Sequence, residues 1–252
     1  MATSKTAVNG DKAARPRIVS KDEWLAERRA LLAAEKEFTR MREALTAKRQ
    51  AMPWVKLEKQ YSFETPAGKK TLAELFGGKS QLLVYHFMLG PEWKEGCPSC
   101  SMAADSFNGI AVHTEQRDVT FTAVSRAPLA HIEAFKKRMG WRFKWASSFG
   151  SDFNPDFAVS FTKDDIERGK NYNFGTTSFP VDEAPGLSAF SKIGNDVYHT
   201  YSTYGRGLED LLGAYVLLDR VAKGRDEEGL EWPMAWVRHH DKYSDGKLVE
   251  LK

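Results

Sequence analysis

The two cysteines of the sequence are the residues best suited to chemistry. They are Cys97 and Cys100 in the segment CPSC, and the 252-residue chain contains no others. Random placement of two cysteines would give this three-residue offset only about one time in a hundred, so the CxxC spacing calls for an explanation. A pair at this spacing can form a disulfide reversibly, whereas a single pair is too little for a disulfide scaffold.

A helix start explains the spacing of the pair. A cysteine is a nucleophile only as its thiolate, so a redox cysteine needs surroundings that favour negative charge. Residues 97–116 predict a helix that begins at or just after Cys97, with Pro98 acceptable in its first turn. The free N–H groups and the dipole of that helix would stabilise the Cys97 thiolate, and Cys100 lies one turn later on the same face. We therefore expect Cys97 to attack a disulfide or an oxidised sulfur, and Cys100 to resolve the mixed intermediate.

Two other interpretations of the CxxC pair stay open. A structural zinc site normally needs four ligands, so the pair would have to recruit histidines. The six histidines show no HxxxH-type spacing, and we assign no metal ligand. They are His86, His113, His131, His199, His239 and His240. Alternatively, the cysteines pack inertly in a redox fold that serves as a binding or scaffold module.

Other residues are secondary candidates for the site. Arg126 lies at the end of the second buried strand and could lower the pKa of Cys97, unless it is an ordinary loop arginine. His86 could relay protons, or be a core histidine bonded to the backbone. Asp105, one turn beyond Cys100, could accept a proton if buried. A group of aromatic residues either walls a pocket or packs in the core. It comprises Trp93, Trp141, Trp145, Phe149 and Phe153.

The segments around the cysteines alternate between strand and helix. Residues 81–89 (QLLVYHFML) form an apolar run typical of a strand buried on both faces, and residues 118–127 read as a second buried strand. Pro128 opens a helix that Gly140 ends. This order predicts a parallel sheet with right-handed crossovers, and it places the cysteines at a strand-to-helix junction.

The remaining segments complete a single core. Residues 61–79 predict two short strands and a helical turn, and residues 186–205 predict a β-hairpin followed by a closing helix over 207–221. Residues 141–185, rich in aromatic residues, predict an elaborated loop with short elements such as FAVSF. We divide the chain into four parts. They are a disordered leader (1–19), an amphipathic helix capped by Ser20 (20–50), the core domain (51–221) and an extension that packs on the core or on a partner subunit (222–252).

Composition excludes several classes of protein. The chain is 42% hydrophobic and 28% charged, which is typical of a globular domain. Its 37 basic and 34 acidic residues are interspersed, so nothing calls for a nucleic-acid partner. No stretch approaches the roughly 18 apolar residues of a membrane span, and the first residues lack the apolar segment of a secretory signal. We expect a cytoplasmic protein that does not bind membranes.

Four blocks of the sequence closely resemble the DUF899 family, which comprises bacterial thioredoxin-like proteins described as predicted dithiol-disulfide oxidoreductases. The blocks are YHFMLGPEWKEGCPSCSMAADSFNG, DVTFTAVSRAPLAHIEAFKKRMGW, SSFGSDFNPDFAVSF and YHTYSTYGRGLEDLLGAY, and the likeness runs over residues 24–243. The resemblance implies an α/β, thioredoxin-like fold with a central mixed sheet flanked by helices, an added N-terminal helix and a loop-rich insertion. It also implies a redox-active disulfide, and we expect such a pair to need no bound cofactor.

The better-known relatives of this fold differ from the sequence near the cysteines. Thioredoxins carry a Trp directly before the first cysteine, where this chain has Gly96 and its nearest Trp is Trp93. Peroxiredoxins carry a Thr three residues before theirs, where this chain has Lys94, so a standard peroxidase site is not expected. Thioredoxin folds also place a cis-proline beside the active site, which we match to Pro185. The next residue, Gly186, would leave its backbone open to a substrate chain.

These observations predict a thiol-disulfide oxidoreductase. Cys97 and Cys100 are the expected catalytic residues, and a further set is expected to support them or bind substrate. That set is Trp93, Pro98, Ser99, Arg126, Pro185 and Gly186. The expected partners are a dithiol electron donor or a disulfide substrate. The long N-terminal helix and the aromatic C-terminal residues are compatible with a homodimer, and the oligomeric state stays open.

Overall fold

The computed structural model describes residues 16–169 and 171–243, and the chain divides into two compact units, Met1–Met52 and Pro53–Lys252. The first unit contains helix α1 (Lys21–Gln50), which the Ser20 side chain caps by accepting the N–H of Glu23 at 3.2 Å. None of the residues of α1 is buried. The predictions for residues 1–15 and 244–252 fall outside the described residues.

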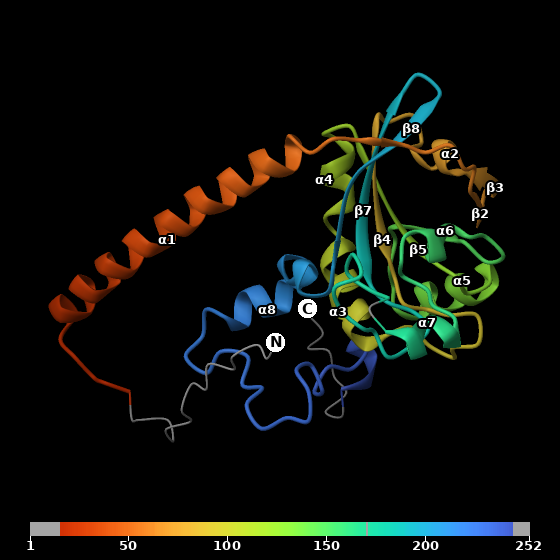
Figure 1. The fold of residues 1–252 in the computed structure, drawn as a ribbon. Helices are drawn as coiled ribbons and strands as arrows, with labels where there is room; N and C mark the ends of the chain where they lie inside the picture. The colour runs from red at the N-terminus through yellow and green to blue at the C-terminus, as the bar shows by residue number, and fades with distance from the viewer. Residues whose placement is uncertain (1–15, 170, 244–252) are drawn as a thin grey trace. The chain divides into compact units, whose positions relative to one another are not determined.

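The second unit is built on an eight-stranded mixed sheet (Figure 1). Its strands are β1 (Val55–Lys56), β2 (Ser62–Thr65), β3 (Gly68–Thr71), β4 (Gln81–His86), β5 (Val119–Ser125), β6 (Lys144–Ser147), β7 (Gly186–Ile193) and β8 (Asp196–Tyr204). They lie in the order β1-β8-β7-β4-β5-β6-β2-β3. Strands β4, β5 and β6 are parallel, and the other pairs are antiparallel.

Helices cover both faces of this sheet. They are α2 (Leu72–Leu75), α3 (Pro98–Phe107), α4 (Ala111–Glu115), α5 (Leu129–Arg138), α6 (Phe153–Asp156), α7 (Lys163–Arg168) and α8 (Gly213–Leu218), with 3-10 helices η1 (Gly205–Leu211) and η2 (His240–Lys242). The chain runs β4, α3, β5, α5, then through β6 to the β7-β8 hairpin and α8. Because β4 lies centrally between β5 and β7, this arrangement is the predicted thioredoxin-like fold. Among the described residues, no helix combines the length and apolar character of a membrane span.

The alternation of side chains along β4 separates two hydrophobic cores. Tyr85 and Phe87 point to the face covered by α3, α5 and α8, whereas Val84 and His86 point to the face covered by α2 and α6. The first core also holds Cys100 and receives Val237 from the C-terminal segment. The position of a residue on β4 therefore decides whether it can reach the cysteines.

Several element boundaries differ from the sequence-based expectation. The helix that starts after Cys97 ends at Phe107, and α4 is separate. The closing helix begins as η1 and breaks before α8, where the N–H of Gly213 bonds Ser106 Oγ at 3.1 Å instead of a carbonyl of its own helix. The FAVSF segment makes only an isolated bridge between Ser160 and Glu183. The insertion also supplies β6, which pairs in parallel with β5, so it is more than a loop.

Candidate active site

The CPSC motif lies at the junction between β4 and α3, at the lower end of the sheet in Figure 1. Cys97 is the N-cap of α3 and Pro98 occupies its first turn. The N–H of Cys97 donates to the Met88 carbonyl at 3.0 Å, and its carbonyl accepts the N–H and the hydroxyl of Ser101, both at 2.9 Å. Both thiols are free, Cys97 partly exposed and Cys100 buried. The predicted helix start at Cys97 is confirmed.

The two sulfurs have opposite acidities. Hydrogen bonds from the Cys100 thiol, the Cys100 N–H and Ser99 lower the pKa of Cys97 to about 7, against the opposing effect of burial. Burial raises the pKa of Cys100 well above its ordinary value, and the neighbouring Cys97 adds to that shift. Near neutral pH, Cys97 is therefore partly ionised while Cys100 keeps its proton. These ionisation states suit Cys97 as a nucleophile and Cys100 as a resolving thiol.

Tyr85 is a site residue that the sequence analysis missed. It lies on β4, is buried, and its hydroxyl hydrogen-bonds the Cys100 sulfur, an interaction that favours the Cys100 thiolate. Burial, with Cys100 beside it, raises the pKa of Tyr85 well above its ordinary value. A tyrosine in a strand predicted to be buried on both faces was the available signal, because its buried hydroxyl needs a partner.

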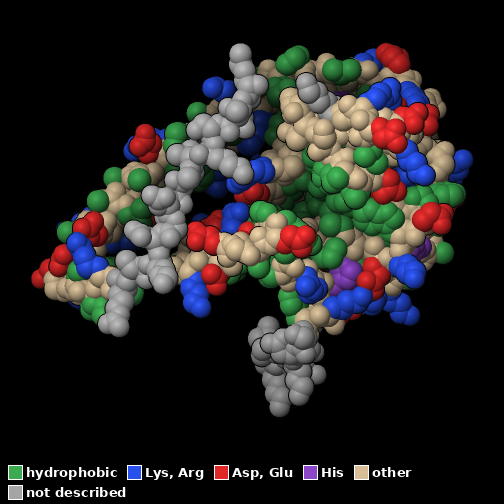
Figure 2. All heavy atoms as spheres, turned by 60° about the horizontal axis from the view of Figure 1, so that its bottom comes forward, with side chains coloured by type: hydrophobic (Ala, Val, Ile, Leu, Met, Phe, Trp, Pro, Cys, Tyr) green, Lys and Arg blue, Asp and Glu red, His purple; other side chains and the backbone are tan. Residues whose placement is uncertain are grey.

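Both cysteines line a pocket of about 560 Å³. Its lining residues are Tyr85, Met88, Cys97, Ser99, Cys100, Phe179, Pro185, Gly205, Arg206, Leu208, Glu209, Leu212, Tyr215, Arg225, Glu227, Pro233 and Met234. Figure 2 brings the bottom of Figure 1 forward and shows hydrophobic side chains gathered around a hollow, with charged side chains around them. Ser99 and Pro185, both predicted as supporting residues, thus share a pocket with the two sulfurs.

The C-terminal segment fixes the residues that directly precede Cys97. We call residues 237–242 the C-terminal strap. Within it, buried His239 bonds the Gly96 carbonyl through Nε2 at 2.7 Å, and Lys242 pairs with Glu95 at 2.6 Å. Arg138 of α5 joins Glu95 to Asp241 of the strap, at 2.9 Å from the latter. The C-terminal strap therefore fixes Glu95 and Gly96, which directly precede Cys97, although the strap itself lies outside the βαβ unit.

Trp93 and Arg126 lie together beside an acidic pair and do not line the pocket. Trp93 Nε1 donates to Asp182 at 3.2 Å, and Arg126 Nε pairs with buried Glu183 at 2.6 Å. The largest contributions to the lowered pKa of Cys97 come from Cys100 and Ser99. Arg126 is not among these leading contributions, and its ion pair with Glu183 directs its charge to that carboxylate.

The environment of Pro185 and Gly186 differs from the expectation in two respects. Residues 16–169 and 171–243 contain no cis peptide bond, so Pro185 lines the pocket with a trans bond. Gly186 is buried between β4 and β8, and an added Cβ would lie 3.0 Å from the Tyr204 ring and 3.1 Å from Val159. Its backbone is consequently closed to a substrate chain, because neighbouring strands already cover it.

The other secondary candidates are structural. His86 points away from the cysteines and bonds Ser188 at 2.8 Å on the far face of the sheet, which excludes direct proton relay to Cys97. Asp105 accepts Trp141 Nε1 at 2.7 Å and contacts His240 at 2.8 Å. Trp141, Trp145 and Phe153 are core residues, whereas Phe149 is 52% exposed. None of these aromatic residues lines the cysteine pocket.

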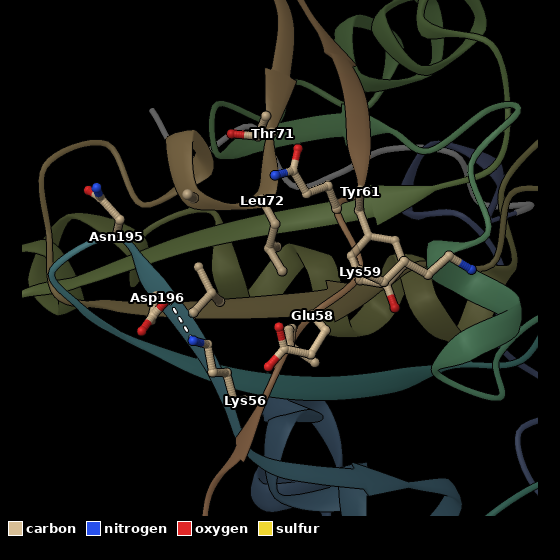
Figure 3. Close-up of a pocket in the computed structure, with 12 residues that line it drawn as sticks. Lys56, Glu58, Lys59, Tyr61, Thr71, Leu72, Asn195 and Asp196 are labelled. Carbon is tan, nitrogen blue, oxygen red and sulfur yellow. Dashed lines mark ion pairs between the residues drawn. The ribbon is translucent and has the colours of Figure 1, made fainter.

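A second pocket, of about 280 Å³, offers no comparable chemistry (Figure 3). It is lined by residues such as Lys56, Tyr61 and Asp196, and the first and last of these form an ion pair at 3.1 Å. It contains no thiol or imidazole. Across the part of the chain that the structure describes, no group of three or more His, Cys, Asp or Glu residues could hold a metal ion, so the zinc interpretation gains no support.

The chain belongs to the DUF899 family, described as bacterial proteins of unknown function, whose model matches residues 13–243. No curated protein matches the chain. Solved structures similar to it include peroxidoxin BcpB from Mycobacterium tuberculosis, at 10% identity and a TM-score of 0.45, covering 64% of this chain and 94% of that one. Another is a cysteine-to-serine mutant of PrxQ from Xylella fastidiosa, at 16% identity and a TM-score of 0.41, covering 62% and 88%. A third is the mitochondrial 2-Cys peroxiredoxin from Plasmodium falciparum, at 14% and 0.41, covering 66% and 91%.

Proposed function

We propose that the protein is a thiol-disulfide oxidoreductase in which Cys97 is the nucleophile and Cys100 the resolving thiol. The observation that carries the proposal is the difference between the two sulfurs. Cys97 is partly exposed, with its pKa lowered to about 7, whereas Cys100 is buried and stays protonated. Because both sulfurs line one pocket, Cys100 can attack the mixed disulfide that a substrate forms with Cys97.

The reaction proceeds in two exchanges. The Cys97 thiolate attacks one sulfur of a disulfide RS–SR, the new Cys97–SR bond forms, and RS⁻ leaves. Cys100 then gives its proton to a leaving thiolate and attacks the Cys97 sulfur, which releases the second RS⁻. The hydrogen bond from Tyr85 to the Cys100 sulfur favours this ionisation. A cellular dithiol donor returns the Cys97–Cys100 disulfide to two thiols, without a bound cofactor.

Trapping of the mixed disulfide tests this assignment. Reduced Cys100→Ser protein mixed with a disulfide reagent should retain a stable adduct on Cys97, visible as one added mass, because nothing resolves it. Cys97→Ser protein should form an adduct far more slowly, because its remaining thiol is buried and protonated. The native protein should lose two thiols and carry no adduct. An adduct that forms on Cys100 at an equal rate would contradict the proposed roles, and one that forms faster on Cys100 would reverse them.

The reduction potential of the pair separates this proposal from its alternative. We expect one two-electron transition between roughly −270 and −180 mV in glutathione or dithiothreitol buffers. If no Cys97–Cys100 disulfide forms at any potential, the oxidoreductase proposal fails and a binding or scaffold role takes its place. In that case, Cys97→Ser should leave partner binding intact. We place the reaction in the cytoplasm, where dithiol donors are available. The oligomeric state, which the sequence leaves open, is tested by the mass of the protein in solution.

A further inference from the structure

The lining of the cysteine pocket is predominantly apolar. Leu208 and Leu212 come from η1 and its end, Tyr215 from α8, and Met234 from the C-terminal segment. Phe179 adds a further apolar side chain from the insertion. A volume of about 560 Å³ is within the usual range of small-molecule sites, which are mostly apolar with a few polar groups.

The charged residues of the pocket neutralise one another. Two arginines and two glutamates line it, so their formal charges cancel. Arg206 pairs with Glu209 at 3.0 Å, and Arg225 pairs with Asp219 at 2.7 Å. The remaining carboxylate, Glu227, accepts the Tyr215 hydroxyl, the Trp236 indole N–H and the Met234 N–H. The described lining residues thus carry no net formal charge, which gives an acidic substrate no electrostatic advantage over a neutral one.

The backbone beside the pocket is closed to an extended peptide. The N–H of Ala184 donates to the Val159 carbonyl at 2.9 Å, and the Pro185 carbonyl accepts the hydroxyl of Tyr172. The next residue, Gly186, pairs with strands on both sides. A substrate chain that docks by strand addition needs free main-chain groups at an edge, and this segment has used the ones named here.

From these three features we infer that the substrate is a small, uncharged disulfide with apolar substituents, whose R group enters the pocket while its sulfur meets Cys97. This inference rests on the proposed function and specifies its substrate class. The chemistry is unchanged: RS–SR and the Cys97/Cys100 dithiol yield two RSH and the protein disulfide, and an added dithiol reductant restores the thiols. Apolar contact with the pocket wall favours longer R groups.

A homologous series of dialkyl disulfides, from dimethyl to dibutyl, tests the inference on the full-length reduced protein. The second-order rate constant for loss of protein thiols is divided by that of dithiothreitol with the same disulfide, which removes intrinsic reactivity. We expect the ratio to rise by up to about fourfold for each methylene that enters the pocket. Glutathione disulfide and the protein disulfides of insulin should give ratios well below that of dibutyl disulfide.

A pair of matched variants tests whether the pocket causes the rise of the rate ratio with alkyl chain length. Met234→Asp places a charge on the pocket wall at a partly buried position. It should make the rate ratio independent of alkyl chain length, which we call a flat series. Leu217→Asp places the same charge on α8 at a side chain that is 69% exposed and outside the pocket, and it should retain the slope. Both variants are first checked for a native circular dichroism spectrum and for a Cys97 that still reacts with iodoacetamide.

The outcomes separate the inference from the proposed function. A rising series in the native protein that Met234→Asp flattens supports the inference. A flat or falling series, or faster reaction with glutathione disulfide or insulin, overturns it while leaving a working oxidoreductase. A rise that Met234→Asp and Leu217→Asp preserve equally also overturns it, because the selectivity would then lie elsewhere. If no disulfide oxidises the pair, the proposed function itself fails.

Discussion

Cys97 and Cys100 differ in exposure and acidity although only two residues separate them. Hydrogen bonds from the Cys100 thiol and from N–H groups at the helix start favour the Cys97 thiolate, while Cys100 turns inward to the core. The spacing of the cysteines and the helix start could be predicted from the sequence. The role of Tyr85 could not, because its contact with Cys100 depends on how β4 and α3 pack.

Alkylation of Cys97 should follow the titration of its thiolate. With its pKa lowered to about 7, the rate of reaction with iodoacetamide should rise with pH and reach half of its plateau near pH 7. The measurement is a rate profile between pH 5 and 10 on the fully reduced protein, with Cys97→Ser as the control for Cys100. A midpoint at the ordinary thiol value of about 8.5 would show that the helix start does not activate Cys97.

Gly96 is required by packing rather than by backbone conformation. An added Cβ would lie 2.5 Å from Phe87 Cε1 and 2.7 Å from Phe135 Cε1, and buried rings cannot move aside easily. We expect Gly96→Ala to lower the free energy of unfolding by about 1–3 kcal/mol, as overpacking does. Urea denaturation measures the loss. Gly109→Ala, where an added Cβ meets nothing within 4 Å, is the control and should be close to neutral.

At the scale of elements, the fold around the site combines predictable and unpredictable parts. The two buried strands, the helix opened by Pro128 and the β7-β8 hairpin follow patterns that the sequence displays. Strand β6 escaped prediction because its four residues, KWAS, are too short to show a period. The C-terminal extension was expected to pack on the core or on a partner subunit. The contact of His239 with Gly96 could not be predicted, because 143 positions of sequence separate the two residues.

Loss of the strap contact should loosen the loop before Cys97. His239→Ala removes the partner of the Gly96 carbonyl, and an unsatisfied buried carbonyl costs about 1–3 kcal/mol. We expect a drop of that size in the free energy of unfolding and faster amide hydrogen exchange over residues 90–97. His113→Ala, at an exposed position on α4, is the matched control. Unchanged exchange in His239→Ala would show that the strap does not hold the loop.

At the scale of the whole molecule, the face opposite the cysteines contains a buried polar chain. His86 bonds Ser188 at 2.8 Å, Ser188 bonds Ser202 at 2.8 Å, and Ser202 bonds His199 at 2.7 Å. Phe153 and Phe157 stack on His86 at 5.5 and 5.8 Å between ring centroids. Three strands supply these side chains, so the series of hydrogen bonds becomes apparent only in the assembled sheet.

This series of hydrogen-bonded side chains should make the stability of the fold sensitive to acid. Burial, with His199 nearby, lowers the pKa of His86 to about 3, whereas an unfolded histidine titrates near 6.5. The unfolded state therefore binds more protons between these values, and the stabilising contribution, full above pH 6.5, is lost as pH falls toward 3. Urea denaturation across pH 3.5–7 should show this loss.

The variant His86→Gln, which cannot be protonated, should show a shallower fall than the native protein over the same pH range. The exposed His113→Gln variant leaves the hydrogen bonds of His86 intact and should keep the native pH dependence. A native slope in His86→Gln would assign the acid sensitivity to other groups. The difference between the two profiles isolates His86 within the molecule as a whole.

The burial of Cys100 leaves Cys97 as the one sulfur of the pair that solvent reaches. Electrons must then enter and leave the protein through the same atom. The dithiol donor and the disulfide acceptor consequently take turns, with no complex that holds both. Steady-state turnover should show the parallel double-reciprocal lines of a ping-pong scheme, and an excess of either reactant should inhibit competitively against the other.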